Sequence, residues 1–223
     1  MLVSQKTQKV ASRLSLQSRA VRSSWLVGAL AGLALLVAPG ASAQAALINT
    51  SACNSAAVTQ PFAAWGDRNL YELLPGGDFE GSLSGWTLSG GAHTTAGSEP
   101  FGATGAVGSS SLALPAGASV QSPFTCVNAA YPTFRFFGRN NGLLSTLLVS
   151  VVYKAPLLGD VAVPVGVVAL SGNWAPSLEM LTASAVTGAL SNGTTQVALR
   201  FTAVTGNSQI DDIFIDPRCM GAG

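Results

Sequence analysis

Short runs of β-forming residues, bounded by glycine, proline, asparagine or serine, recur from about residue 61 to the C-terminal end. No stretch has a helical period long enough to matter. In Gln196–Thr202 the residues Val197, Leu199 and Phe201 alternate with polar ones, as in a half-buried strand. About nine short strands at this spacing predict an all-β fold, an antiparallel β-sandwich of the jelly-roll type.

The predicted strands differ in how much of each face they should bury. Leu147–Tyr153 and Val165–Leu170 are continuous apolar runs, so both are expected to be covered on both faces, with Pro164 placing an edge or a bulge at the start of the second. Thr133–Arg139 nearly alternates and predicts a half-buried strand. Shorter strands are expected at Tyr71–Leu74, Trp86–Leu88, Ser110–Leu114, Ala118–Ser122 and Gln209–Ile215.

The first 43 residues have the features of an export signal. Residues 1–22 are basic and serine-rich, residues 25–37 are apolar, and Ala41-Ser42-Ala43 has the small-x-small form that signal peptidase cuts. An anchor helix needs about 18–20 apolar residues, and this run has about 14 before its proline. The sequence predicts cleavage after Ala43 and no later membrane span. The expected organisation is a signal peptide (1–43), a flexible lead-in (44–60), the sandwich (61–218) and a tail (219–223), in a protein that is secreted, extracellular or associated with the cell surface.

The charge distribution excludes several classes of function. Five of the eleven basic residues lie before residue 23, so the chain after residue 43 holds six basic and ten acidic residues. That composition cannot form a basic stripe along a phosphate backbone, which excludes nucleic acid as a partner. One histidine, His93, and the absence of a Gly-x-Ser-x-Gly elbow argue against triad catalysis. We therefore expect no enzyme activity.

Three cysteines, Cys53, Cys126 and Cys219, follow the leader. Disulfides persist outside the cytoplasm, and with three cysteines one is left without a partner in the same chain. A bridge between Cys53 and Cys126 would close a loop of about 73 residues and stabilise by roughly 4 kcal/mol. We predict that pair, with Cys219 free or joined to another chain.

Two segments carry a resemblance to a known family. Residues 73–81, followed by Gly85-Trp86, resemble the first strand and turn of galactose-binding-like jelly rolls, the fold of many carbohydrate-binding modules, and residues 209–216 resemble their last strand. Further segments between them are similar to a group of secreted actinobacterial proteins of uncharacterised activity. The resemblance covers most of residues 53–218 and implies a fold more strongly than an activity.

The same two segments hold five of the ten acidic residues, and the resemblance implies that the fold brings them side by side. Clustered carboxylates repel one another, and calcium is their natural partner outside the cell. By this resemblance a structural calcium ion is expected, with Glu80 and Asp212 as the principal ligands and Asp78 and Asp211 behind them. The alternatives are solvated turn residues or a pairing with Arg68 or Arg218. A glycosidase pair is not expected, because alternation places Asp211 and Asp212 on opposite faces of a strand.

A sugar-binding role would need flat aromatic residues beside amide or arginine side chains. The candidates are Trp174 beside Asn173, together with Tyr131, Arg135 and Arg139. Trp86 is expected in the core, and Trp65 is undecided. The sequence predicts a secreted noncatalytic binding module for extracellular polysaccharide or cell-envelope glycan. The alternative is a structural or protein-interaction domain of the cell envelope without a glycan ligand.

Overall fold

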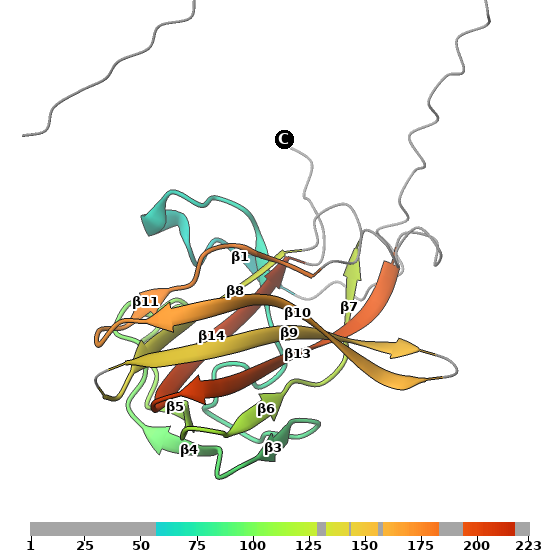
Figure 1. Cartoon of the computed structure of the whole chain (residues 1–223). Coiled ribbons are helices and arrows are strands. Elements are labelled where there is room, and N and C mark those ends of the chain that lie inside the picture. The colour runs from blue at the N-terminus through green and yellow to red at the C-terminus, as the bar shows by residue number, and fades with distance from the viewer. Residues whose placement is uncertain (1–56, 129–132, 143, 156–157, 183–193, 217–223) are drawn as a thin grey trace, which may run out of the picture. The chain divides into compact units, whose positions relative to one another are not determined.

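The computed structural model describes residues 57–128, 133–142, 144–155, 158–182 and 194–216. These residues form strands and one 3-10 helix, and they contain no helix that could span a membrane (Figure 1). In chain order the elements are β1 (Val58–Thr59), the 3-10 helix η2 (Ala63–Trp65), β2 (Tyr71–Leu73), β3 (Thr87–Ser89), β4 (His93–Ala96), β5 (Ser110–Leu114), β6 (Ser119–Gln121), β7 (Thr125–Asn128), β8 (Thr133–Asn140), β9 (Ser145–Ala155), β10 (Gly159–Leu170), β11 (Ala175–Pro176), β12 (Met180–Leu181), β13 (Thr194–Thr205) and β14 (Ser208–Asp216).

The strands form two antiparallel sheets. The first has the order β1-β2-β14-β5-β4, and β8 pairs with β14 while β11 and β12 pair with β8. The second has the order β10-β9-β13-β6-β3, with β7 also paired to β13. The chain crosses from one sheet to the other between β8 and β9 and again between β13 and β14. The predicted all-β antiparallel sandwich of the jelly-roll type is confirmed.

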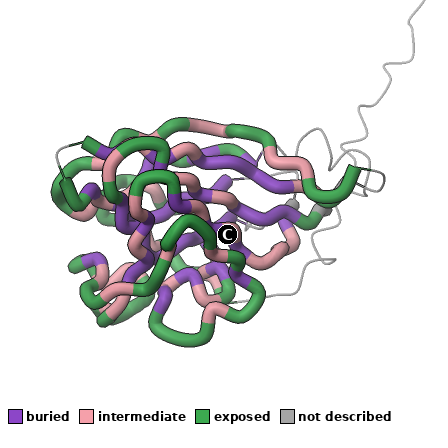
Figure 2. Tube along the Cα trace, turned by 60° about the horizontal axis from the view of Figure 1, so that its bottom comes forward, coloured by how far each residue is buried: buried purple, intermediate pink, exposed green. Residues whose placement is uncertain are grey.

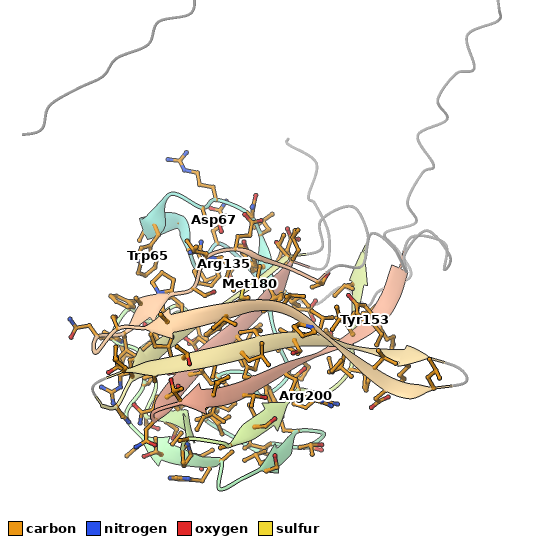
Figure 3. All side chains as sticks on the ribbon, viewed as in Figure 1. Trp65, Asp67, Arg135, Tyr153, Met180 and Arg200 are labelled. Atoms are coloured by element: carbon orange, nitrogen blue, oxygen red, sulfur yellow. The ribbon has the colours of Figure 1, made fainter. Side chains whose placement is uncertain are left out.

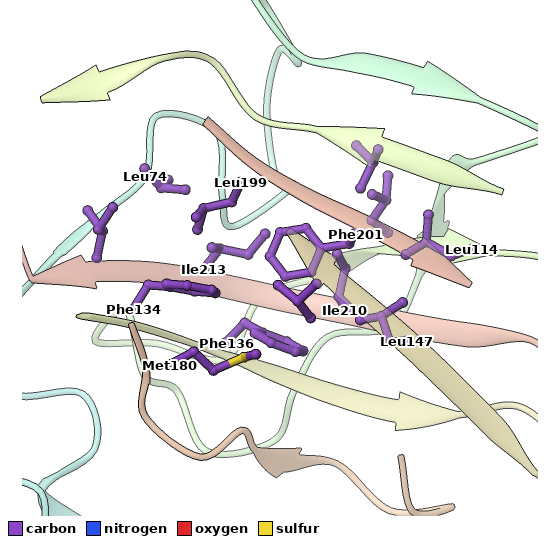
Figure 4. Close-up of a cluster of buried hydrophobic side chains, with 14 of the residues drawn as sticks. Leu74, Leu114, Phe134, Phe136, Leu147, Met180, Leu199, Phe201, Ile210 and Ile213 are labelled. Carbon is purple, nitrogen blue, oxygen red and sulfur yellow. The ribbon is translucent and has the colours of Figure 1, made fainter. Parts of the chain in front are cut away.

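The main core lies between the two sheets (Figure 4). Phe136 of β8 meets Phe201 of β13 edge to face, with 5.0 Å between ring centroids. Both side chains are fully buried, and burial of a phenylalanine contributes roughly 1.5–3 kcal/mol. The predicted inward positions Val197, Leu199 and Phe201 are confirmed, as is the core position of Trp86, whose Nε1 donates to the Pro75 carbonyl at 2.8 Å.

One of the two strands expected to be covered on both faces is an edge strand instead. β9 lies between β10 and β13 and is largely buried. β10 pairs only with β9, and Val167 on its outer side is 66% exposed. The prediction for Val165–Leu170 was wrong: Val165, Val168 and Leu170 pack against the core, but nothing in the described residues covers the other face at Val167. The register shift between Pro164 and Gly166 confirms the expected bulge.

A second, smaller core lies on the outer face of the first sheet. Successive residues of β8 point to opposite faces, so Phe134 and Phe136 enter the main core while Phe137 faces outward. There Phe137 packs with three other buried aromatic residues, Phe62, Tyr71 and Phe214. The N-terminal segment around η2 contributes Phe62 to this cluster. In Figure 2 the central strands are largely buried, and the exposed positions lie mainly in the connections and in the outer strands. This second core supports the surface described next.

Candidate functional site

A hollow of about 440 Å³ opens between η2 and the loop that connects β4 to β5. Residues 59–61, 64 and 65 line one side, and residues 101–105 line the other. Two of its aromatic side chains reach solvent: Trp65 is 39% exposed and Phe101 is 48% exposed. Exposed aromatic rings beside a concavity are the usual means of holding a ligand with an apolar face.

Both aromatic rings stand on a rigid base. The Trp65 and Phe101 rings meet edge to face, with centroids 4.9 Å apart and planes 85° apart. Each ring also contacts Phe137, at 5.4 Å and 5.7 Å, and Phe62 stacks on Phe137 at 5.3 Å. Because Phe62 and Phe137 are fully buried, the orientation of the two exposed rings is fixed by the second core.

The loop that carries Phe101 is held by a buried carboxylate. Glu99 is completely buried, and its two oxygens accept the backbone N–H groups of Phe101 at 2.5 Å and Ala103 at 2.8 Å. The N–H of Glu99 and the hydroxyl of Ser98 in turn donate to one oxygen of Asp211, at 2.9 Å and 2.7 Å. These bonds tie the aromatic wall of the hollow to β14.

Strand alternation predicts that Asp211 and Asp212 of β14 lie on opposite faces of the sheet, but in the structure they do not. The register shifts between Asp211 and Phe214, and Asp212 has a φ of 44°. This bulge turns both side chains toward Glu99, and both residues are buried. Burial raises the pKa of Asp211 to about 7. Burial, together with the negative charges of Asp211 and Glu99, raises the pKa of Asp212 to about 8.

The residues predicted to bind calcium separate into two groups. Asp78 adds a negative charge near Asp212 and so joins the buried acids of β14. Glu80 is exposed, and its oxygens accept the backbone N–H groups of Ser109 and Ser110, both at 2.7 Å, and the Ser109 hydroxyl at 2.6 Å. These hydrogen bonds lower the pKa of Glu80. Nothing in the described part of the chain links Glu80 to Asp212.

The residues that the structure describes include no group of three or more His, Cys, Asp or Glu placed to hold a metal ion. Carboxylate oxygens are the right chemistry for calcium. However, both oxygens of Glu99 already accept hydrogen bonds from its own loop, and both oxygens of Glu80 accept hydrogen bonds from Ser109, which lies just before β5. The calcium site therefore stays a prediction from the resemblance.

Three of the predicted ligand-binding residues lie together. The Arg139 guanidinium lies over the Trp174 ring, 5.0 Å from its centroid, and its Nε donates to Gln209 at 2.5 Å. Asn173 is exposed beside them. Trp174 is only partly exposed, because it packs against the second core while Arg139 lies over its ring. It therefore offers less free ring surface than Trp65 or Phe101.

Arg135 is not a surface residue. It is buried and forms an ion pair with Asp67, with 2.8 Å between Nη1 and Oδ2 (Figure 3). Its other nitrogens donate to the Ser177 carbonyl, and its guanidinium lies 4.3 Å from the centroid of the Phe62 ring. The expectation that Arg135 contacts a ligand is corrected, since strand alternation directs it into the second core. Tyr131, the remaining candidate, lies outside the described residues.

Cys126 is a half-buried residue of β7 and is disulfide-bonded. Cys53 and Cys219 both lie outside the described residues. The pairing of Cys126 with Cys53 therefore stays a prediction.

Sequence reasoning left Trp65 undecided and missed Phe101 and Glu99. A proline beside an aromatic residue in a glycine-rich loop, as at Pro100 and Phe101, is a signal of an exposed ring. No local pattern shows that Trp65 and Phe101, 36 positions apart in sequence, would meet. The register of β4, β5 and β14 brings them together.

A second hollow, of about 580 Å³, lies between β10 and residues 176–181. Its lining is mostly apolar, and Leu178 at its rim is 85% exposed. Glu179 is the only charged residue that lines it. It has no exposed aromatic ring and so offers no stacking surface for a sugar.

No protein-family model matches this chain, and no curated protein is similar to it in sequence. Similar solved structures include the CBM22-1 and GH10 modules of the Clostridium thermocellum endo-1,4-β-D-xylanase 10B with xylohexaose (16% identity over 69% of this chain and 30% of that chain, TM-score 0.42). Another is the family 11 carbohydrate-binding module from Clostridium thermocellum with a β-1,3-1,4-mixed-linked tetrasaccharide (14% identity over 67% of this chain and 96% of that chain, TM-score 0.46). A third is the CBM22-1 xylan-binding domain of Paenibacillus barcinonensis Xyn10C (15% identity over 66% of this chain and 93% of that chain, TM-score 0.39).

This chain spans less than a third of the xylanase chain and nearly all of the two isolated modules. At these identities and TM-scores, the function of this chain has to be argued from its own residues. The resemblance to secreted actinobacterial proteins is not addressed by these similarities and stays a prediction.

Proposed function

We propose that this chain is an exported, noncatalytic module that binds extracellular polysaccharide or cell-envelope glycan. The observation that carries the proposal is the pair of exposed aromatic rings, Trp65 and Phe101, fixed beside a hollow by a buried aromatic base. A pyranose ring presents an apolar face that stacks on such a surface, while its hydroxyl groups need polar partners at the edges. Trp174, with Arg139 and Asn173, is a second predicted contact on the same sheet face.

The carboxylates of the described residues support binding rather than hydrolysis. A glycosidase needs two carboxyl groups facing each other across the sugar. None of the residues that line the hollow carries a carboxyl group. Glu99 and Asp211 are buried, and they accept hydrogen bonds that hold the loop of Phe101. Their role is structural in this proposal.

Export rests on the leader sequence and is supported by the disulfide at Cys126, because structural disulfides form in oxidising compartments. Secretion, with the protein extracellular or held at the cell surface, is therefore part of the proposal. A structural calcium ion is also retained as a proposal from the resemblance, to be tested by removing calcium.

The test is binding of the purified protein to a panel of soluble polysaccharides, measured by affinity electrophoresis and then by calorimetry. We expect at least one polysaccharide to retard the protein. Trp174→Ala, tested in parallel, asks whether the second predicted contact takes part. If no polysaccharide binds, the alternative of a structural or protein-interaction domain is favoured. The second hollow, with the exposed Leu178 at its rim, would then be the surface to test for a protein partner. Turnover of any glycoside or ester substrate would contradict the noncatalytic part.

A further inference from the structure

The shape of the hollow is the first clue to what it holds. The Trp65 and Phe101 planes are nearly perpendicular, so the two rings form a corner rather than a flat platform. A corner can contact the face of a sugar ring with one aromatic residue and its edge with the other. A volume of about 440 Å³ lies at the lower end of ordinary small-molecule sites, which suits one or two sugar residues rather than a long chain segment.

The polar groups around the corner are uncharged. Gln60 and Thr104 are exposed, and Thr59 completes the set of polar side chains that line the hollow. Gln60 donates from Nε2 to the Arg68 carbonyl at 2.6 Å, and its Oε1 is an acceptor that a ligand hydroxyl could use. Thr104 donates to the Ala106 carbonyl at 3.3 Å, so its oxygen can also accept. Each group can pair with a hydroxyl.

The absence of charge in the lining decides between two classes of sugar. No lysine, arginine, histidine, aspartate or glutamate is among the residues that line the hollow. A uronic acid or sulfated sugar would bring an anion against apolar walls without a cation to pair it, which disfavours its binding. A neutral sugar has no such penalty, and its hydroxyl groups match the amide and hydroxyl groups on the rim.

The corner is also held in place before any ligand arrives. Two hydrogen bonds to Glu99 fix the backbone on either side of Gly102, and Phe137 supports both rings from beneath. A pre-positioned wall loses little conformational entropy on binding, which favours affinity for a small ligand.

We infer that the corner between Trp65 and Phe101 is a subsite for one ring of a neutral sugar, a hexose or pentose without an acidic group. This inference rests on the proposed function and deepens it by giving the ligand class and the residues. Trp65 and Phe101 supply the stacking surfaces, and Gln60 and Thr104 accept hydrogen bonds from ligand hydroxyls.

The experiment compares two variants of the full chain, Trp65→Ala and Phe101→Ala, with the control Leu144→Ala. Leu144 is also an exposed apolar residue, but it lies in the turn between β8 and β9 and lines neither hollow. The probes are mixed-linkage β-glucan, β-1,4-galactan and arabinan as neutral polymers, and polygalacturonate and alginate as acidic ones. We expect each corner variant to weaken binding to a neutral polymer at least about tenfold, and the control to bind like the wild type.

Trp65 also gives a direct readout that does not depend on folding of the alanine variants. Addition of the bound polymer should shift the tryptophan emission of Trp174→Phe, and should leave that of the double variant Trp65→Phe/Trp174→Phe unchanged, because Trp86 is buried. Preference for polygalacturonate or alginate would overturn the ligand class. Binding that survives in both corner variants but is lost in Trp174→Ala would overturn the subsite while leaving the proposed function intact. No binding to any polymer would contradict the proposed function itself.

Discussion

Replacing Asp212 with asparagine should stabilise the protein at neutral and alkaline pH. The Asp212 carboxyl is buried, and the groups that raise its pKa include the carboxylates of Asp211 and Glu99 and a hydrogen bond with Glu99. The pKa of Asp212 is about 8 in the folded protein, against 3.8 for an unperturbed aspartate, the value taken for the unfolded chain. An amide resembles the protonated acid, since it is neutral and can donate to Glu99. Asparagine also tolerates the positive φ of this position.

The magnitude follows from the pKa difference. The raised pKa means that the native state holds its proton more tightly, so the stability that depends on this proton is complete below about pH 4. It is lost as the pH rises toward 8. About three units separate 3.8 from pH 7, and each unit corresponds to about 1.4 kcal/mol. The asparagine variant should therefore gain up to about 4 kcal/mol in unfolding free energy at pH 7. Such a gain would raise the melting temperature by roughly 10 °C.

The assay is urea unfolding of wild type and Asp212→Asn at pH 5, 7 and 8 in the presence of a calcium chelator. We expect the difference between the two proteins to be smallest at pH 5, at about 2 kcal/mol, and to grow as the pH rises toward 8. Asp160→Asn, which removes an exposed acid of β10, serves as the control and should follow the wild type. If Asp212→Asn is no more stable than the wild type at pH 8, the carboxyl is not an uncompensated buried charge and the reasoning fails.

Three further outcomes are expected. Asp67→Asn should lower the unfolding free energy by about 3 kcal/mol in urea titrations, because it leaves the Arg135 guanidinium buried without its partner. Burial opposes ionisation of Asp67, but its hydrogen bonds, including that from Arg135, outweigh burial and lower its pKa, so this contribution should also fade as the pH falls below 4. Trp86→Phe should cost about 1 kcal/mol or more by thermal melting, since the Pro75 carbonyl loses its indole donor. If calcium binds as the resemblance implies, the melting temperature should fall when a chelator replaces calcium. Glu80→Gln should abolish most of that difference. Equal melting temperatures in metal-free and calcium-loaded protein would refute the calcium proposal.

Local patterns along the chain were enough to predict the fold class and most of the strands. A period of two residues and glycine-rich turns are local properties, and they act in the same way in almost any sandwich. For that reason the alternation of Val197, Leu199 and Phe201 and the core position of Trp86 could be read directly from the chain. The bulge at Pro164 was also a local prediction, because proline cannot donate to a neighbouring strand.

Which polar and aromatic residues reach solvent depends on how distant segments pack together. The same alternation that places Phe136 in the main core turns Arg135 toward Asp67, but the existence of a second core around Phe137 depends on the path of the N-terminal segment. The bulge in β14 turns Asp212 to the side of Glu99, and no residue type in that strand signals it. The corner between Trp65 and Phe101 joins two loops whose meeting depends on strand register over the whole sheet, which is a long-range property that no local pattern encodes.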